Sequence, residues 1–257
     1  MHVIVTGGSS GIGLEVARIY ANRGARISII ARTAAMLGSA VADLSSTGNP
    51  DIRCECADVA DTSQIESAVR VCEAAFGPCD ILVASAGMVE PEFFDQQSAD
   101  DFALQINVNL YGTANAVRAA YPRMKSRGQG AIMIVSSGAA LIGIPGYTAY
   151  CAAKSALTGF AEALQAESVG HGVTVSLCFP PDTETPQFRN ELAKRPAQAR
   201  ALMGAAPPWK ADAVAEKIVR GIDRRSRKVY FGFSITGLGL FGPLVKPFVT
   251  AWFSRRR

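Results

Sequence analysis

A tyrosine and a lysine lie four residues apart in TAYCAAKSAL, the segment from Thr148 to Leu157. If this segment is a helix, Tyr150 and Lys154 share one face, one turn apart. A free tyrosine has a pKa of about 10, and a neighbouring ammonium favours its phenolate. The pair is therefore suited to exchanging a proton near neutral pH. The spacing alone is common, and an ordinary surface pair is the competing interpretation.

A serine upstream completes a plausible proton-transfer site. Ser137 directly follows the apolar run AIMIVS (131–136) and lies thirteen residues before Tyr150. Its hydroxyl could hold a substrate carbonyl oxygen while Tyr150 protonates that oxygen. The three side chains together therefore indicate the reduction of a ketone.

A glycine-rich turn near the start of the chain indicates a nucleotide cofactor. TGGSSGIG, from Thr6 to Gly13, follows an apolar run and precedes a helical pattern. Its glycines allow a tight turn and close approach of a pyrophosphate, which the following helix N-terminus favours. Such turns are common, but this position after the first predicted strand favours nucleotide binding. The candidate contacts are Gly7, Ser9, Ser10, Gly11, Ile12 and Gly13.

The end of the second apolar run indicates which nucleotide is used. An NAD enzyme would place a carboxylate there, on the ribose 2′-hydroxyl. No Asp or Glu occurs between Gly24 and Val41, and Arg32 stands at this position instead. A guanidinium suits a 2′-phosphate, so we expect NADPH rather than NADH. The alternative for Arg32 is a solvated loop cation.

The third apolar run is followed by ADVAD, which contains Asp58 and Val59. We expect both residues at the cofactor, with the Asp58 carboxylate accepting from the adenine amino group. The alternative is that Asp58 caps the next helix, a role that Asp61 or Thr62 fills better.

Short apolar runs alternate with helical patterns along the chain, which predicts an α/β fold with a doubly wound (Rossmann) parallel sheet. In such sheets ligands bind beyond the carboxyl ends of the strands. The predicted strands are 2–6, 26–31, 52–56, 80–84, 131–136, 173–179 and 228–232, and helices are expected to start near residues 11, 33, 62, 99, 148 and 212.

Composition narrows the possible functions further. The chain has 257 residues, 49% of them hydrophobic, which suffices for one well-buried domain. A net charge of +4 is too weak to indicate nucleic-acid binding. With two histidines, six cysteines and no CxxC pair, we expect no metal site. No secretory signal opens the sequence, so we expect reduced thiols in the cytoplasm.

These motifs together resemble the short-chain dehydrogenase/reductase family, over about the first 180 residues. The resemblance rests on the glycine turn, Ser137, the Tyr150/Lys154 pair and Asn109 in NVNLYG. It implies that Tyr150 is the general acid/base and that Lys154 lowers its pKa and binds the nicotinamide ribose. Ser137 would orient the substrate, and Asn109 would support a proton relay through water.

The sequence departs from the family pattern at two places. The family's Asn-Asn-Ala-Gly after the fourth strand is ASAG here, where Ala86 and Gly87 still let a cofactor pass closely. The usual Pro-Gly after the sixth strand is replaced by FPPDTETPQF, from Phe179 to Phe188. This loop, like the helix around Tyr150, is similar to that of the 3-ketodihydrosphingosine reductases within the family. Pro180 and Thr183 would then contact the cofactor.

The second resemblance implies NADPH-dependent reduction of a long-chain ketone lipid, 3-oxosphinganine, to sphinganine. Two alternatives remain: a 3-oxoacyl thioester or broad-specificity carbonyl reductase, and a catalytically idle NADPH-binding membrane scaffold. The family commonly forms dimers or tetramers, so we expect a homo-oligomer. The segment 180–210 is the expected substrate loop.

The C-terminal region is apolar and ends in arginines. Residues 229–245 carry no charge, and SRRR closes the chain. We divide the chain into a cofactor-binding domain, 1–231, and a tail, 232–257. The tail is interrupted by Gly and Pro and is short for a span of about 20 residues. We expect either an interfacial anchor on the cytoplasmic face of a membrane, with Trp252 at the headgroups, or a tail packed on a partner copy or over the substrate pocket.

Overall fold

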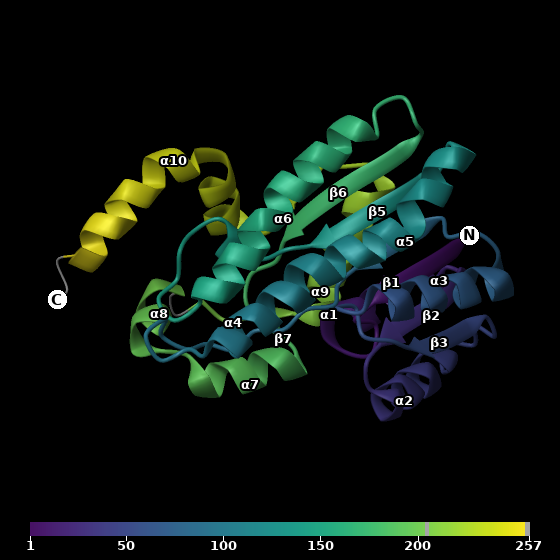
Figure 1. The fold of residues 1–257 in the computed structure, drawn as a ribbon, viewed down its shortest axis with the longest axis horizontal. Helices are drawn as coiled ribbons and strands as arrows, with labels where there is room; N and C mark the ends of the chain where they lie inside the picture. Colours follow the sequence, from purple (N-terminus) through teal and green to yellow (C-terminus); the bar gives the residue numbers. More distant parts are fainter. Residues whose placement is uncertain (204–205, 255–257) are drawn as a thin grey trace.

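The computed structural model describes residues 1–203 and 206–254, and within these ranges the chain forms a seven-stranded parallel sheet between two layers of helices (Figure 1). This confirms the predicted doubly wound fold. Five of the seven predicted strand starts and five of the seven ends agree to the residue. In spatial order the strands are β3 (Ile52–Cys56), β2 (Arg26–Ala31), β1 (His2–Thr6), β4 (Ile81–Ala84), β5 (Gly130–Val135), β6 (Val173–Phe179) and β9 (Lys228–Tyr230).

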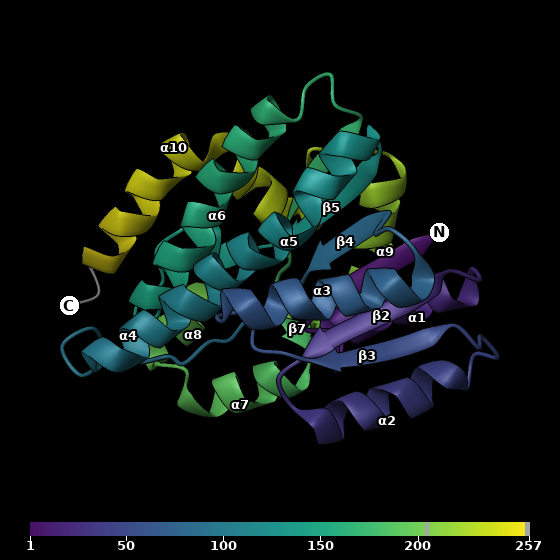
Figure 2. The same ribbon diagram turned by 45° about the vertical axis from the view of Figure 1, so that its right-hand side comes forward.

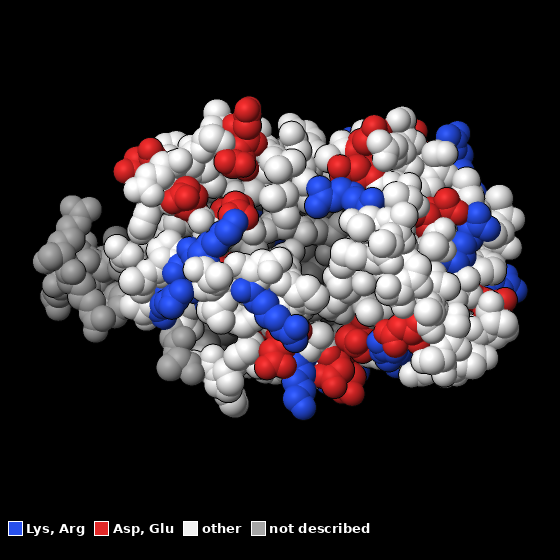
Figure 3. Space-filling model, turned by 90° about the horizontal axis from the view of Figure 1, so that it is seen from below, with Lys and Arg blue, Asp and Glu red and all other residues white. Residues whose placement is uncertain are grey.

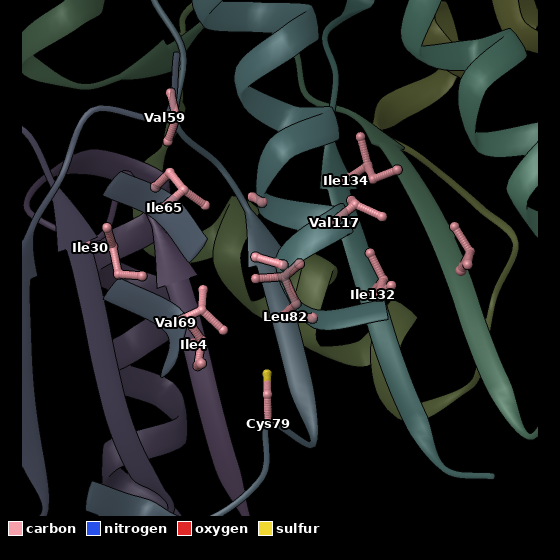
Figure 4. Close-up of a cluster of buried hydrophobic side chains, with 14 of the residues drawn as sticks. Ile4, Ile30, Val59, Ile65, Val69, Cys79, Leu82, Val117, Ile132 and Ile134 are labelled. Carbon is pink, nitrogen blue, oxygen red and sulfur yellow. The ribbon is translucent and has the colours of Figure 1, made fainter. Parts of the chain in front are cut away.

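Both faces of the sheet are buried because alternate strand residues point to opposite sides. Ile4 packs with one helix layer, whereas its neighbours Val3 and Val5 pack with the other. Figure 4 shows the first of these clusters, in which Leu82 and Ile132 meet side chains of the covering helices. That layer is α3 (Thr62–Phe76), α5 (Gly112–Arg127) and α6 (Thr148–Glu167), and the other is α1 (Gly11–Asn22), α2 (Ala34–Ser45) and α9 (Ala211–Asp223).

A wider helical turn places a polar residue beside the sheet edge. The helices α4 (Ala99–Ile106) and α5 are joined without a break by the π-helical turn η1 (Asn107–Tyr111). The buried Asn109 lies in this turn. Such π turns are frequently found at functional sites. The sequence predicted the start of α4 but not the continuation through η1 into α5.

The segment between β6 and α9 is more ordered than the predicted substrate loop. It contains β7 (Thr183–Glu184), α7 (Pro186–Lys194), α8 (Ala197–Met203) and β8 (Trp209–Lys210), and β7 pairs with β8. The Thr185 hydroxyl accepts from the Phe188 N–H and caps α7, whose first residue is Pro186. Both features favour a helix start. A second short element, the 3-10 turn η2 (Gly138–Ala140), follows β5.

The predicted last strand, 228–232, forms β9 over residues 228–230, and the apolar tail that follows folds as a helix. Helix α10 (Gly232–Ser254) is broken at Phe241, and its part beyond this point extends from the body in both ribbon views (Figures 1 and 2). Before the break, Ile235 packs on the core. None of the helices in the described ranges is long and apolar enough to cross a membrane. The Trp252 side chain and Arg255–Arg257, named in the anchor hypothesis, lie outside what the structure describes.

Candidate active site

The carboxyl ends of the central strands surround a cavity of about 310 Å³. Its walls come from the turns after β1, β2, β3, β4, β5 and β6 and from α6, α7 and η1. On the face seen from below in Figure 3, the surface is hollowed near the middle, and Lys and Arg side chains lie at the edge of the hollow. Of the predicted site residues, the cavity is lined by Gly7, Ser9, Ser10, Gly11, Ile12, Gly13, Arg32, Val59, Ala86, Gly87, Asn109, Ser137, Tyr150, Lys154, Pro180 and Thr183.

The glycine turn has no room for larger side chains. A Cβ on Gly13 would lie 2.4 Å from the Gly7 carbonyl oxygen, and one on Gly7 would lie 2.7 Å from the Ala86 backbone. Gly7 and Gly11 also have positive φ angles of 68° and 56°. Bare backbone at the N-terminus of α1 therefore faces the cavity, which is what a bound pyrophosphate requires. The turn fits the predicted dinucleotide.

Arg32 lines the cavity at the end of β2, where it was expected.

Among the predicted site residues, Asp58 is the one that does not line the cavity. Its carboxylate accepts a hydrogen bond from the Ala60 N–H at 2.9 Å. Its neighbour Val59 does line the cavity. Asp61, and not Asp58, caps α3 by accepting from the Gln64 N–H, as expected if Asp61 fills the capping role better.

Tyr150 and Ser137 face each other across the cavity. The Tyr150 pKa is raised above its ordinary value by burial, and a hydrogen bond with Ser137 partly offsets this. The charge of Lys154 is not among the leading causes. A raised pKa keeps the phenol protonated at neutral pH. The arrangement therefore suits Tyr150 to donating a proton to an oxygen that Ser137 also contacts.

Lys154 lies one turn beyond Tyr150 on α6, as the spacing predicted. Its ammonium is 5.7 Å from the Tyr150 ring centroid and donates to the Val135 carbonyl oxygen at 3.1 Å. Only 4% of the residue is exposed. Burial lowers its pKa to about 8. Lys154 is therefore a buried cation held between the end of β5 and Tyr150.

Asn109 organises the loop after β4. Its amide donates to the carbonyl oxygens of Met88 and Gln105, both at 2.8 Å, and its Oδ1 accepts from the Met88 N–H at 3.2 Å. A Cβ on Gly87 would lie 2.9 Å from this oxygen and 3.4 Å from the Lys154 nitrogen. The side chain thus holds the loop, and Gly87 is the residue that this close approach requires. The Asn109 backbone carbonyl accepts from the Thr113 hydroxyl.

A buried polar network that the sequence did not predict joins the segment after β6 to the start of α6. The Arg195 guanidinium contacts Asp182 and Glu191 at 2.6 Å each and donates to the Tyr147 hydroxyl at 3.2 Å. That hydroxyl donates to Glu191 at 2.7 Å. Tyr147 and Tyr150 pack edge to face. No local pattern indicates these contacts, because Tyr147 is more than forty residues from both partners in the chain.

The cofactor contacts predicted after β6 lie at the cavity, but they are held by local bonds. The Thr183 hydroxyl donates to the Pro181 carbonyl oxygen at 2.8 Å. The Pro180 carbonyl oxygen accepts from the Gly138 N–H, next to Ser137. These contacts tie the loop after β6 to the end of β5.

Comparison with known proteins identifies the architecture. Residues 1–196 match the family model described as short chain dehydrogenase. The chain belongs to the short-chain dehydrogenase/reductase family. The resemblance inferred from the glycine turn, Ser137, Tyr150, Lys154 and Asn109 is therefore confirmed at the level of the family.

Among members of this family, the chain is similar to several 3-dehydrosphinganine reductases. It is 39% identical over 224 residues to one from Arabidopsis thaliana, covering 86% of this chain and 66% of that protein. It is 38% identical over 223 residues to one from Danio rerio, covering 85% and 67%. The alignments thus span about two thirds of the length of these relatives.

Solved structures of short-chain dehydrogenase/reductase folds agree with this arrangement. The crystal structure of gox2181 superposes with a TM-score of 0.82 at 28% identity, over 91% of this chain and 95% of that one. Levodione reductase gives the same TM-score at 22% identity, over 90% and 95%, which supports the fold alone.

Proposed function

We propose that this chain reduces 3-oxosphinganine to sphinganine with NADPH. The proposal rests on the observation that the glycine turn, Ser137, Tyr150 and Lys154 all line one cavity. The substrate comes from the names of the relatives, which are 3-dehydrosphinganine reductases.

The residues present fit the proposed cofactor. The bare backbone of the glycine turn, at the N-terminus of α1, would hold the pyrophosphate, and Arg32 would pair with the 2′-phosphate. Lys154 would contact the nicotinamide ribose. When bound, NADPH supplies the hydride that reduces the carbonyl carbon.

The chain's own side chains handle the ketone oxygen. Ser137 donates a hydrogen bond that orients it, and Tyr150 transfers its phenolic proton to it. Lys154 and Asn109 then return a proton to Tyr150 through water. The Asn109 amide is engaged with Met88 and Gln105, so we assign this part to the backbone carbonyl, which also accepts from the Thr113 hydroxyl.

The alkyl chain is proposed to lie along the segment 188–209. Phe188 and Met203, from α7 and α8, line the cavity together with Ile144, and Met203 and Tyr150 pack against the apolar cluster that contains Ile144. These side chains provide apolar contact for a lipid tail.

The experiment compares initial rates on 3-oxosphinganine and a 3-oxoacyl thioester, each with NADPH and with NADH. We expect the highest kcat/KM for 3-oxosphinganine with NADPH. A higher value for the thioester would favour the alternative reductase. Preference for NADH would contradict the role of Arg32. If no ketone led to cofactor oxidation, the remaining alternative would be a catalytically idle NADPH-binding scaffold.

We also propose that α10 rests on the cytoplasmic face of a membrane and that the chain forms a homo-oligomer. The membrane proposal is supported by the exposed apolar side chains of α10, which are Phe233, Leu240, Phe241, Leu244 and Phe248. A lipid substrate resides in such a surface, so contact there would shorten its path to the cavity.

A further inference from the structure

The charged residues that line the cavity, within the described part of the chain, divide by sign. Arg32 and Lys154 are cations, at the end of β2 and on α6. Asp182 and Glu191 are anions, and both belong to the segment after β6 that also supplies Phe188. The cations suit an anionic nucleotide. The two carboxylates need another explanation, because they would repel its phosphates.

These carboxylates are fixed in place by the protein. Arg195, which is 7% exposed, contacts both of them at 2.6 Å from behind and is not itself among the residues lining the cavity. The Tyr147 hydroxyl binds Glu191 from the side of α6. Two carboxylates and one guanidinium leave a net charge of −1 at this wall.

The anionic wall lies near the reacting group. Glu191 binds the Tyr147 hydroxyl, and the Tyr147 ring packs edge to face against Tyr150 with the ring centroids 6.4 Å apart. The charges of Glu191 and Asp182 also contribute to raising the pKa of Tyr150. Glu191 is also one helical turn from Phe188 on α7, at the proposed path of the alkyl chain. A ligand here therefore has its ketone at Tyr150, an apolar part at Phe188 and a cationic group close to the ketone.

We infer that Glu191, supported by Asp182, is a specificity-determining residue that binds a protonated amine next to the ketone of the substrate. The inference rests on the proposed function, since 3-oxosphinganine carries a primary amine on the carbon beside its carbonyl. A 3-oxoacyl thioester has no cation at this position. The wall therefore selects an amino ketone over a neutral one of equal length.

The test compares 3-oxosphinganine with 1-hydroxyoctadecan-3-one, the same chain without the amine. Glu191→Gln keeps an oxygen for Tyr147 and Arg195 but removes the charge. We expect its kcat/KM for the amino ketone to fall about 10- to 100-fold, the usual effect of losing a hydrogen bond between charged groups. The value for the neutral ketone and the KM for NADPH should change less than about twofold.

Glu184→Gln is the matched control, because Glu184 is an exposed carboxylate of the same segment outside the cavity lining. It should leave both ketones unchanged. The ratio of the two ketone rates does not depend on the folded fraction, so partial unfolding of a variant cannot mimic the result. Asp182→Asn should lower this ratio in the same direction.

Three results would overturn the inference. An equal fall in kcat/KM on both ketones would show that Glu191 is structural, and unchanged kcat/KM values on both ketones would show that it does not meet the amine. In both cases turnover by the unmodified protein would leave the proposed function standing. If the unmodified protein reduced neither ketone, the proposed function would fail and the inference with it.

Discussion

At the scale of single residues, the site depends on how burial acts on two neighbouring ionisable groups. Burial raises the pKa of the Tyr150 phenol and lowers that of the Lys154 ammonium to about 8. Both shifts favour the neutral form of each group. In the structure, Lys154 contacts the ring face and the Val135 carbonyl oxygen. The proposed effect of Lys154 on the tyrosine pKa therefore stays a prediction for the complex with cofactor.

Tyr150→Phe removes the proton that the reduction needs while keeping the ring. We expect kcat to fall at least about 100-fold, in the range typical of general acid catalysis. NADPH affinity, measured by fluorescence titration, should change little. Turnover close to that of the unmodified protein would contradict the assignment of Tyr150.

Lys154→Met tests how much the buried ammonium lowers the free energy of unfolding. Below about pH 8 Lys154 is charged in both the folded and the unfolded chain, so the full burial penalty applies. Between about pH 8 and 10 only the folded chain loses the proton, and its stability should rise relative to the variant by roughly 3 kcal/mol. We therefore expect the variant to be the more stable protein at pH 7 and inactive.

Urea unfolding of both proteins at pH 7, 8.5 and 9.5 measures this difference. A difference in the free energy of unfolding that stays constant over this range would show that Lys154 does not titrate there. NADPH must be omitted, because its binding would add stability of its own.

Most of the proposed catalytic set was predictable from residue types and spacing, but its surroundings were not. Tyr150 and Lys154 share a helix face, so four residues of sequence suffice to relate them. The contacts of Tyr147 with Glu191 and Arg195 cross more than forty residues and carry no local signature. The adenine contact of Asp58 stays a prediction, because ADVAD fits both a ligand contact and a turn in which Asp58 bonds Ala60.

At the scale of elements, the strands were predictable because each is a short apolar run bounded by turn residues. The segment 180–210 was predicted only as a loop, because its helices are short, polar and interrupted by Pro196. Helix α10 was equally difficult, since Gly and Pro normally indicate an end to a helix. Its chain does break, at Phe241.

Gly13→Ala tests the glycine turn that begins α1. A Cβ there would lie 2.4 Å from the Gly7 carbonyl oxygen, so the turn must shift. We expect NADPH affinity to fall more than about tenfold and the free energy of unfolding to fall by about 1–3 kcal/mol.

Gly38→Ala, on α2, is the control because nothing lies within 4 Å of its added Cβ. It should leave NADPH affinity unchanged and raise the free energy of unfolding by about 0.5–1 kcal/mol. Equal NADPH affinities for the two variants would contradict the role of the turn.

At the scale of the whole molecule, apolar side chains are buried in the sheet domain but exposed on the last helix. Alternate strand residues are buried on both faces of the sheet, whereas α10 beyond Phe241 displays them. Leu244 is 69% exposed and Phe248 is 77% exposed. The α10 surface is thus a candidate contact with lipid or with a second copy.

Replacing Leu244 and Phe248 together with Gln should weaken binding to anionic phospholipid vesicles at least about tenfold, because two large apolar side chains no longer enter the interface. Val71→Gln is the control, since Val71 is 37% exposed on α3, at the opposite end of the molecule from α10 in Figure 1. Sedimentation with vesicles measures the binding. Unchanged vesicle binding with a smaller mass in lipid-free solution would assign the helix to a partner copy instead.

Thr185 has a consequence for the binding of both proposed ligands. Its methyl group would lie 2.8 Å from a Cβ on Gly11, and its hydroxyl begins α7, the helix that carries Phe188 and Glu191. The segment from Thr185 to Glu191 therefore borders the proposed nucleotide site at one end and the proposed ketone site at the other. A displacement of this segment on binding one ligand would change the surroundings of the second. If both ligands bind as proposed, we expect each to alter the affinity for the other by the same factor.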